Sequence, residues 1–324
     1  MYDYYMEKFV YQMFILGTGK YLDNALEKGL GGVIFFAHDI ESKEQFQNLI
    51  KNIVKKSKKT PFLSIDQEGG RVERTEKIHP RYLSPRFAYQ RGEEFLTEQT
   101  LTIARELKEY GINLNFAPCA DVNTNPNNPI IGERAFSDNS KDVSNGVKLV
   151  SEIYRQNGII PCVKHFPGHG DADKDSHLTL PQIDLSMKEM ENIHILPFKK
   201  AIENNIEMIM AAHLHCTCFD KKVIPASLSK NAIGYLRNNL NYGGVVITDD
   251  MVMKGVQDFG SVEACLMAIN AGVDMFIFRE ADEKTYETIE QLAGEIIKNP
   301  NLQKKVIDAN ERILHLKQMY GIIS

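Results

Sequence analysis

The sequence predicts an α/β fold, a (β/α)8 TIM barrel that forms a single domain over residues 1–324. Short runs rich in β-branched and aromatic residues alternate with longer amphipathic segments, as in repeated βα units around a parallel sheet. There are eight such runs, the number of strands that closes this barrel. The length of 324 residues also fits, because these barrels need about 250 residues in one piece.

The eight predicted strands are distributed along the whole chain. In order they are Tyr11 to Leu16, Val33 to Phe36, Phe62 to Asp66, Leu114 to Pro118, Pro161 to Phe166, Met208 to His213, Val245 to Asp250 and Met275 to Arg279. The clearest helices between them are Glu93 to Tyr110, Asp142 to Gln156, Lys188 to Glu203 and Val262 to Ala271. Glycine follows three of these helices, at positions 111, 158 and 272, and is a common helix stop signal.

Composition and charge indicate an ordinary globular protein. The chain is 43% hydrophobic and 25% charged, and its net charge of -5 is spread without a long block of one sign. We therefore expect no nucleic-acid partner. No apolar stretch approaches the roughly 20 residues of a membrane helix, and no secretion signal is evident at the N-terminus, so we expect a cytoplasmic protein without a membrane partner. The five cysteines are an odd number, which favours reduced thiols over a disulfide framework. We also expect the protein to be a monomer.

Several apolar strands end in polar residues. The residues concerned are Asp66, His165, His213, Asp249 and Asp250. In a parallel barrel the carboxyl ends of the strands converge on one face, where barrel enzymes keep their chemistry. A charge buried elsewhere in the barrel would carry a large desolvation cost. The coincidence of five such residues therefore favours a functional site at that face.

The segment from Lys164 to His177 is the densest in chemically active residues. It reads Lys-His-Phe-Pro-Gly-His-Gly-Asp-Ala-Asp-Lys-Asp-Ser-His. The close spacing of Asp175 and His177 allows a carboxylate to orient an imidazole and raise its basicity, which makes the pair a natural proton shuttle near neutral pH.

A second segment, residues 243–251, is a buried strand that delivers two adjacent carboxylates to the same face. Successive strand side chains point in opposite directions, so we expect Asp249 to face the barrel axis. Asp250 is then expected to cap the next helix or to bond the loop.

Two further segments contain polar groups in loops. Asp66 begins the string Asp-Gln-Glu-Gly-Gly-Arg-Val, whose polar groups suit sugar hydroxyls and whose glycines let the backbone approach a ligand. Arg134 lies in the string Gly-Glu-Arg-Ala-Phe-Ser and, taken alone, is typical of a surface residue.

These four strings together resemble glycoside hydrolase family 3, and in particular its single-domain β-N-acetylglucosaminidases (β-hexosaminidases) of the peptidoglycan-recycling type. They occur in the family's order and span nearly the whole chain. The Asp-Ser-His ending at residues 175–177 points to N-acetylglucosaminidases, because the family's β-glucosidases take their acid from elsewhere.

The resemblance implies a retaining enzyme that releases terminal β-linked N-acetylglucosamine. By this likeness Asp249 attacks the anomeric carbon, and His177, paired with Asp175, serves as acid and then as base. The hydroxyl-binding residues would be Asp66, Arg134, Lys164 and His165. The implied substrate is a small carbohydrate, such as a cell-wall muropeptide or a chitobiose-like disaccharide, and neither a cofactor nor a metal is expected.

Other functions remain open at this stage. A metal-dependent barrel hydrolase is favoured by the number of possible zinc ligands, which are His165, His169, His177, His213, His215 and Asp249. A β-glucosidase or a glycoside phosphorylase of the same family, or a silent sugar-binding protein on the same scaffold, are further alternatives.

Overall fold

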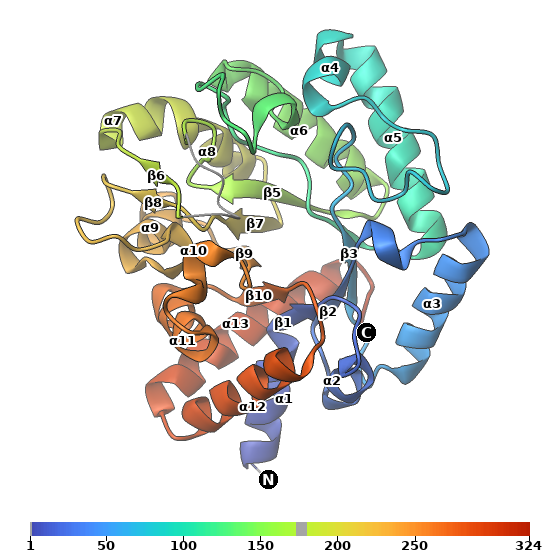
Figure 1. Cartoon of the computed structure of the whole chain (residues 1–324), viewed down its shortest axis with the longest axis vertical. Helices are drawn as coiled ribbons and strands as arrows, with labels where there is room; N and C mark the ends of the chain where they lie inside the picture. The colour runs from blue at the N-terminus through green and yellow to red at the C-terminus, as the bar shows by residue number, and fades with distance from the viewer. Residues whose placement is uncertain (1, 173–179) are drawn as a thin grey trace.

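The computed structural model describes residues 2–172 and 180–324 and contains a closed barrel of parallel strands, in agreement with the predicted fold (Figure 1). Around the barrel the strand order is β1-β10-β9-β7-β5-β4-β3-β2. The barrel strands are β1 (Phe14–Leu16), β2 (Gly32–Phe35), β3 (Phe62–Ile65), β4 (Leu114–Asn115), β5 (Ile160–Phe166), β7 (Met208–Ala211), β9 (Val245–Asp250) and β10 (Met275–Phe278). Each of the eight predicted runs therefore overlaps one barrel strand.

Six of the predicted strands extend past the observed ones, and two of them, at β1 and β4, do so by three residues. Tyr11 and Gln12 belong to helix α1 (Tyr2–Gln12), where the Tyr11 hydroxyl donates to Glu290 Oε1 at 2.6 Å. The end of a buried helix and a buried strand can have the same short apolar run, so periodicity alone could not distinguish the helix from the strand. The predicted fourth strand extended to Pro118, but β4 stops at Asn115, and Pro118 has no amide hydrogen to donate to a ladder.

The main helices surround the strands as an outer layer (Figure 1). They are α1, α2 (Leu22–Lys28), α3 (Lys43–Lys56), α5 (Glu93–Tyr110), α6 (Ser140–Gln156), α8 (Leu196–Glu203), α11 (Ser261–Ala271), α12 (Glu283–Ile297) and α13 (Pro300–Met319). Shorter helical segments are α4 (Pro85–Gln90), α7 (Met187–Glu189), α9 (Lys230–Gly234), α10 (Lys254–Gln257), η1 (Ala37–Asp39), η2 (Gly132–Arg134), η3 (Met190–His194), η4 (Ala226–Leu228) and η5 (Tyr235–Asn239). Gly111 and Gly272 end α5 and α11 in the left-handed conformation, as the stop signals predicted.

The prediction of one continuous helix from Lys188 to Glu203 was wrong. This stretch is divided into α7, the π-helical turn η3 and α8. Pro197 lies in the first turn of α8, and proline cannot donate the backbone hydrogen bond that a continuous helix would need there.

A small two-stranded sheet lies beside the barrel and was not predicted. It pairs β6 (Gln182–Ile183) with β8 (His215–Cys216) in parallel. Two-residue strands carry too little pattern to be recognised from sequence. The sheet connects β8, which follows β7, with β6, which lies shortly after residue 179.

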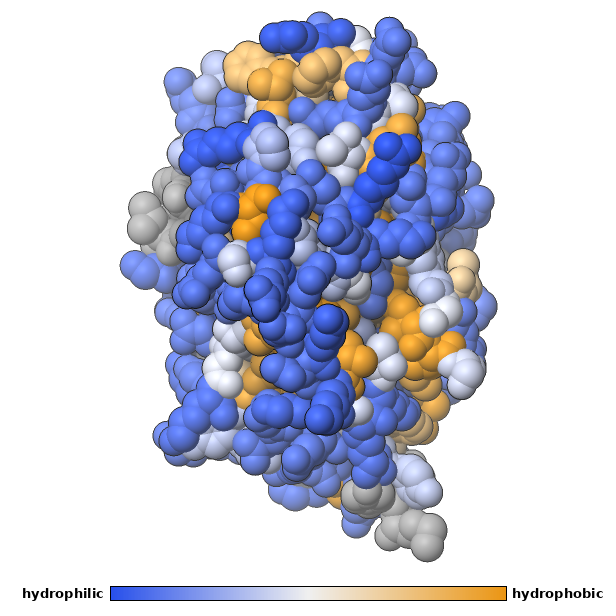
Figure 2. All heavy atoms as spheres, turned by 90° about the vertical axis from the view of Figure 1, so that its right-hand side faces the viewer, coloured by the Kyte–Doolittle hydropathy of each residue, from blue (hydrophilic) through white to orange (hydrophobic). Residues whose placement is uncertain are grey.

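The outer surface is mainly hydrophilic on the face that Figure 2 shows, and hydrophobic residues there form small separate groups. Isolated apolar side chains on a surface are normal and need no partner to explain them. Among the described residues, no helix has both the length and the apolar character needed to cross a membrane.

Candidate active site

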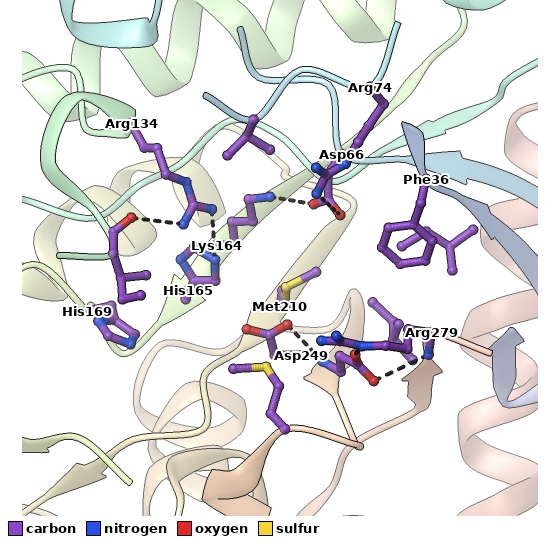
Figure 3. A pocket seen from close by; sticks show the side chains of 16 residues that line it. Phe36, Asp66, Arg74, Arg134, Lys164, His165, His169, Met210, Asp249 and Arg279 are labelled. Atoms are coloured by element: carbon purple, nitrogen blue, oxygen red, sulfur yellow. Dashed lines mark hydrogen bonds and ion pairs between the residues drawn. The ribbon is translucent and has the colours of Figure 1, made fainter. Parts of the chain in front are cut away.

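A pocket opens at the carboxyl ends of the barrel strands, with a volume of about 790 Å³ that includes its open mouth (Figure 3). Five of the seven predicted catalytic and sugar-binding residues line it: Asp66, Arg134, Lys164, His165 and Asp249. They come from the ends of β3, β5 and β9 and from η2, so the structure brings together groups that are far apart in the chain. The predicted Asp175 and His177 lie outside the described residues.

Lys164 is the central cation of the pocket wall. Its Nζ atom lies 2.6 Å from Asp66 Oδ1 and 2.6 Å from Glu68 Oε1, and its side chain is only 2% exposed. Burial lowers the pKa of Lys164, but the two carboxylates outweigh that effect and the net shift is upward. Lys164 therefore stays charged and holds Asp66 at the pocket wall. The peptide bond between Lys164 and His165 is cis.

Arg134 is buried rather than on the surface, contrary to what its loop position suggested when it was taken alone. Its Nε and Nη2 atoms donate to the two oxygens of Glu68 at 2.9 and 2.8 Å, which is the bidentate geometry of a strong ion pair. Burial by itself would raise the pKa of Glu68, but Arg134 and Lys164 together hold it well below its usual range. The pair explains why the guanidinium tolerates burial.

His165 is oriented by two partners. Its Nδ1 atom lies 2.7 Å from Asp121 Oδ2, and its Nε2 atom lies 3.3 Å from Arg134 Nη2. Because a guanidinium has only donors, Nε2 must accept and Nδ1 must carry the hydrogen that Asp121 accepts. These two contacts fix the orientation of the His165 ring.

Asp249 presents a carboxylate to the pocket from the end of β9 (Figure 3). Its Oδ1 atom accepts the Asp250 amide at 2.8 Å, and no other hydrogen bond to this carboxylate occurs among residues 2–172 and 180–324. Burial raises the pKa of Asp249, but His165, His213, the Asp250 amide and Lys164 outweigh it, so the net shift is downward. An ionised carboxylate without a cationic partner is a suitable nucleophile.

Asp250 also borders the pocket but is held by the protein. Its carboxylate forms an ion pair with Arg279 and accepts the Val252 amide at 3.1 Å. Asp250 was expected either to cap the next helix or to bond the loop, and it bonds the loop. The N-cap of α10 is Met253. Burial raises the pKa of Asp250, and Arg279 offsets part of that shift.

Some residues that line the pocket or hold its lining residues in place were not assigned to the site from sequence. Glu68 is part of the string that begins at Asp66, and Asp121 follows the fourth predicted strand by three residues, so position alone could have suggested both. Arg74 and Arg279 at the pocket wall carry no local signal that separates them from ordinary loop residues, and His169 beside His165 was considered only as a possible zinc ligand.

His213 and His215, two of the possible zinc ligands named from sequence, are hydrogen-bonded to other groups of the protein. His213 is bonded at both ring nitrogens, to Ser227 Oγ at 2.7 Å and to the Asp250 carbonyl at 3.1 Å. His215 Nδ1 instead faces the backbone of Ile224 at 3.2 Å. These rings support the end of β9 and a neighbouring loop.

Within the described part of the chain, one group has side chains close enough to share a metal ion: Cys119, Asp121 and His165. Its polar atoms are bonded to one another, since the Cys119 thiol donates to Asp121 Oδ2 at 3.1 Å and His165 donates to the same oxygen. Burial and the nearby carboxylate of Asp121 raise the pKa of Cys119 well above its usual value, so this sulfur is a thiol. The three groups satisfy each other without an ion.

Comparisons with known proteins agree on one family. Residues 18–316 match the model of the glycosyl hydrolase family 3 N terminal domain. Beta-hexosaminidase A of Pseudoalteromonas piscicida is 34% identical over 317 residues, which cover 89% of this chain and 53% of that protein. A beta-hexosaminidase of Haemophilus influenzae is 32% identical, over 81% of this chain and 76% of its own length.

Among solved structures, a glycoside hydrolase family 3 beta-N-acetylglucosaminidase from Paenibacillus sp. str. FPU-7 superposes with a TM-score of 0.92 at 29% identity. The match covers 98% of this chain and 62% of that one, so the chain spans about half to three fifths of these two larger relatives. Because the family model matches nearly all of the chain and relatives above 30% identity cover most of it, the chain belongs to glycosyl hydrolase family 3.

Proposed function

We propose that this chain is a retaining β-N-acetylglucosaminidase, working as one domain over residues 1–324, that hydrolyses terminal β-linked N-acetylglucosamine. Relatives that cover most of the chain bear the name beta-hexosaminidase, and the Paenibacillus structure is a beta-N-acetylglucosaminidase. The observation that carries the proposal is the Asp249 carboxylate, which has no cationic partner among the described residues and faces a wall of fixed hydrogen-bonding groups across one pocket.

The proposed chemistry has two steps. The Asp249 carboxylate attacks the anomeric carbon and forms a covalent glycosyl ester, while the leaving oxygen takes a proton from His177. Water, deprotonated by the same imidazole, then cleaves the ester and regenerates the carboxylate. Asp175 is assigned to orient the His177 ring and raise its basicity. The downward pKa shift of Asp249 supports its role, because the nucleophile must be ionised.

The pocket wall is suited to bind sugar hydroxyls. Asp66 offers acceptor oxygens, while Lys164 and Arg134 offer donors, and each is held by a buried partner before any ligand arrives. His165 adds a ring of fixed orientation. Groups positioned in advance lose little freedom when a ligand binds, which improves affinity. The pocket's cations and anions therefore match a neutral, hydroxyl-rich ligand.

For the natural substrate we propose a small carbohydrate, with a muropeptide or a chitobiose-like disaccharide as the two forms to compare. We also propose that the enzyme acts as a monomer without a cofactor or metal. Hydrolysis and phosphorolysis differ only in the acceptor of the glycosyl ester, so rates with and without inorganic phosphate, and a search for sugar 1-phosphate, distinguish the two.

The direct test is hydrolysis of 4-nitrophenyl β-N-acetylglucosaminide by the wild-type chain and by Asp249→Asn. We expect the variant to lose turnover on the order of 10⁴-fold or more, because an amide cannot form the glycosyl ester. Asp258→Asn, an exposed aspartate in the following loop, is the matched control and should keep wild-type activity.

A fluorinated substrate that accumulates the covalent intermediate then locates the nucleophile by peptide mass analysis. We expect the label on Asp249. A label on Asp250, or a wild-type chain that is inactive on every N-acetylglucosaminide tested, would refute the proposal.

A further inference from the structure

His169 is a buried polar side chain of the pocket that the proposed mechanism does not use. The residue is 3% exposed and lines the pocket next to His165, with their ring centroids 6.1 Å apart (Figure 3). Neither of its ring nitrogens has a hydrogen-bond partner in the described part of the chain. A polar group buried without a partner is costly, so such a group beside a pocket calls for a ligand.

The backbone on both sides holds His169 in one position. The His169 amide donates to Asp121 Oδ1 at 2.6 Å, and its carbonyl accepts from Asn128 Nδ2 at 2.8 Å. A Cβ atom at Gly168 would lie 2.7 Å from the Cβ of His194, and one at Gly170 would lie 1.8 Å from the Val122 carbonyl oxygen. The two glycines thus let the chain pack closely here, which fixes the place of the imidazole before a ligand arrives.

The imidazole is neutral at physiological pH. Burial lowers the pKa of His169 to about 4, and the attraction of Asp121 offsets only part of that effect. A neutral imidazole has one N–H donor and one acceptor nitrogen. The group that satisfies both is one that accepts and donates, such as a hydroxyl or a secondary amide, whereas a carboxylate can only accept and an ammonium can only donate.

We propose that His169 is a sugar-binding and specificity-determining residue, whose ring nitrogens bind an uncharged hydroxyl or acetamide group of the sugar in the pocket. The inference rests on the proposed function, which supplies the sugar, and adds to it a contact that neither the motifs nor the relatives assign. It places a neutral hydrogen-bonding group beside the charged pairs of Lys164 and Arg134.

His194 provides a matched comparison. It is fully buried in η3, its ring nitrogens also have no partner among the described residues, and burial lowers its pKa as well. It does not, however, line the pocket. A variant of His194 therefore shows what the loss of a buried, unpartnered imidazole does when no sugar can reach it.

The test compares His169→Phe, His169→Asn and His194→Phe with the wild-type chain. Two measurements are made: KM and kcat on 4-nitrophenyl β-N-acetylglucosaminide and on the corresponding β-glucoside, and the Kd of N-acetylglucosamine by calorimetry. We expect His169→Phe to weaken sugar binding and raise KM by about tenfold, the effect of about one hydrogen bond. His169→Asn keeps a donor and an acceptor and should recover part of the loss. Thermal melts check that each variant folds.

The two substrates identify the group that is bound. A loss confined to the N-acetylated substrate assigns the acetamide, and an equal loss on both assigns a hydroxyl. The inference is overturned if His169→Phe binds the sugar like the wild-type chain, or if His194→Phe shows the same loss. An inactive wild-type chain would instead refute the proposed function, which keeps the two failures distinct.

Discussion

The substitution Glu68→Gln tests whether the buried charge cluster supports both the fold and the site. The Glu68 side chain is 1% exposed and is shared by Arg134 and Lys164 at 2.6–2.9 Å. Removing one member of a buried ion pair costs about 3–5 kcal/mol, because the remaining charges are left uncompensated. We expect about 3 kcal/mol here, since glutamine keeps one acceptor oxygen and Lys164 keeps Asp66 as its partner.

The loss is measured as a shift of the melting temperature. At about 2 °C per kcal/mol, the lower end of the range for larger proteins, Glu68→Gln should melt about 6 °C below the wild-type chain at pH 7. The value of kcat/KM should fall as well, because Arg134 and Lys164 lose a common anchor. Glu27→Gln, on the exposed side of α2, is the control and should melt like the wild-type chain.

The difference in stability between the wild-type chain and Glu68→Gln should also depend on pH. The pKa of Glu68 is lower in the folded chain than the usual value of about 4.3, so its carboxylate stabilises the fold above that pH. That stabilisation is lost as the pH falls from about 4.3 toward the folded pKa, so the gap between wild type and Glu68→Gln should narrow below about pH 4. A gap under 2 °C at pH 7, or one of constant size down to pH 3, would refute this reasoning.

Four further predictions concern the chemistry. His177→Ala should spare glycosides whose leaving group needs no protonation, and equal losses on activated aryl glycosides and natural disaccharides would contradict the role of His177. The acid limb of the kcat/KM profile should lie below about pH 3.9, because Asp249 must be ionised and its pKa is lowered; a limb above pH 5 would argue against Asp249. Cys218 is half-buried while the other four cysteines are buried, so one thiol equivalent should react rapidly with a thiol reagent, and Cys218→Ser should remove that phase. Dialysis against a chelator should leave activity unchanged, and a loss that zinc restores would favour the metal-dependent alternative.

The motifs and the barrel could be read from the chain because their signals are local. Strands buried on both faces need continuous apolar runs, and helices that cover them need one apolar side, so eight alternating runs are enough to predict the architecture. Polar residues at the ends of those runs, such as Asp66 and Asp249, then mark the face that holds the site. The resemblance to the family followed from the same strings.

Some boundaries could not be predicted, because different structures have the same local pattern. The run ending at Leu16 reads equally well as a strand or as a helix followed by a strand, and only the packing of α1 against α12 separates the two. Likewise the periodicity from Lys188 to Glu203 fits one helix, although Pro197 interrupts its hydrogen bonds.

The sequence by itself determined which residue types arrive at the catalytic face, whereas only the tertiary structure decided which of them pair and which remain available. Glu68 meets Arg134 across 66 residues of chain, and Asp66 meets Lys164 across 98, so no local pattern could reveal either pair. Each of these pairs is needed for stability, because a buried charge without a partner carries a large desolvation cost. Arg134 is therefore buried in the pocket wall against Glu68, although its loop sequence is typical of the surface. The carboxylate of Asp249 faces the pocket and is available to a ligand.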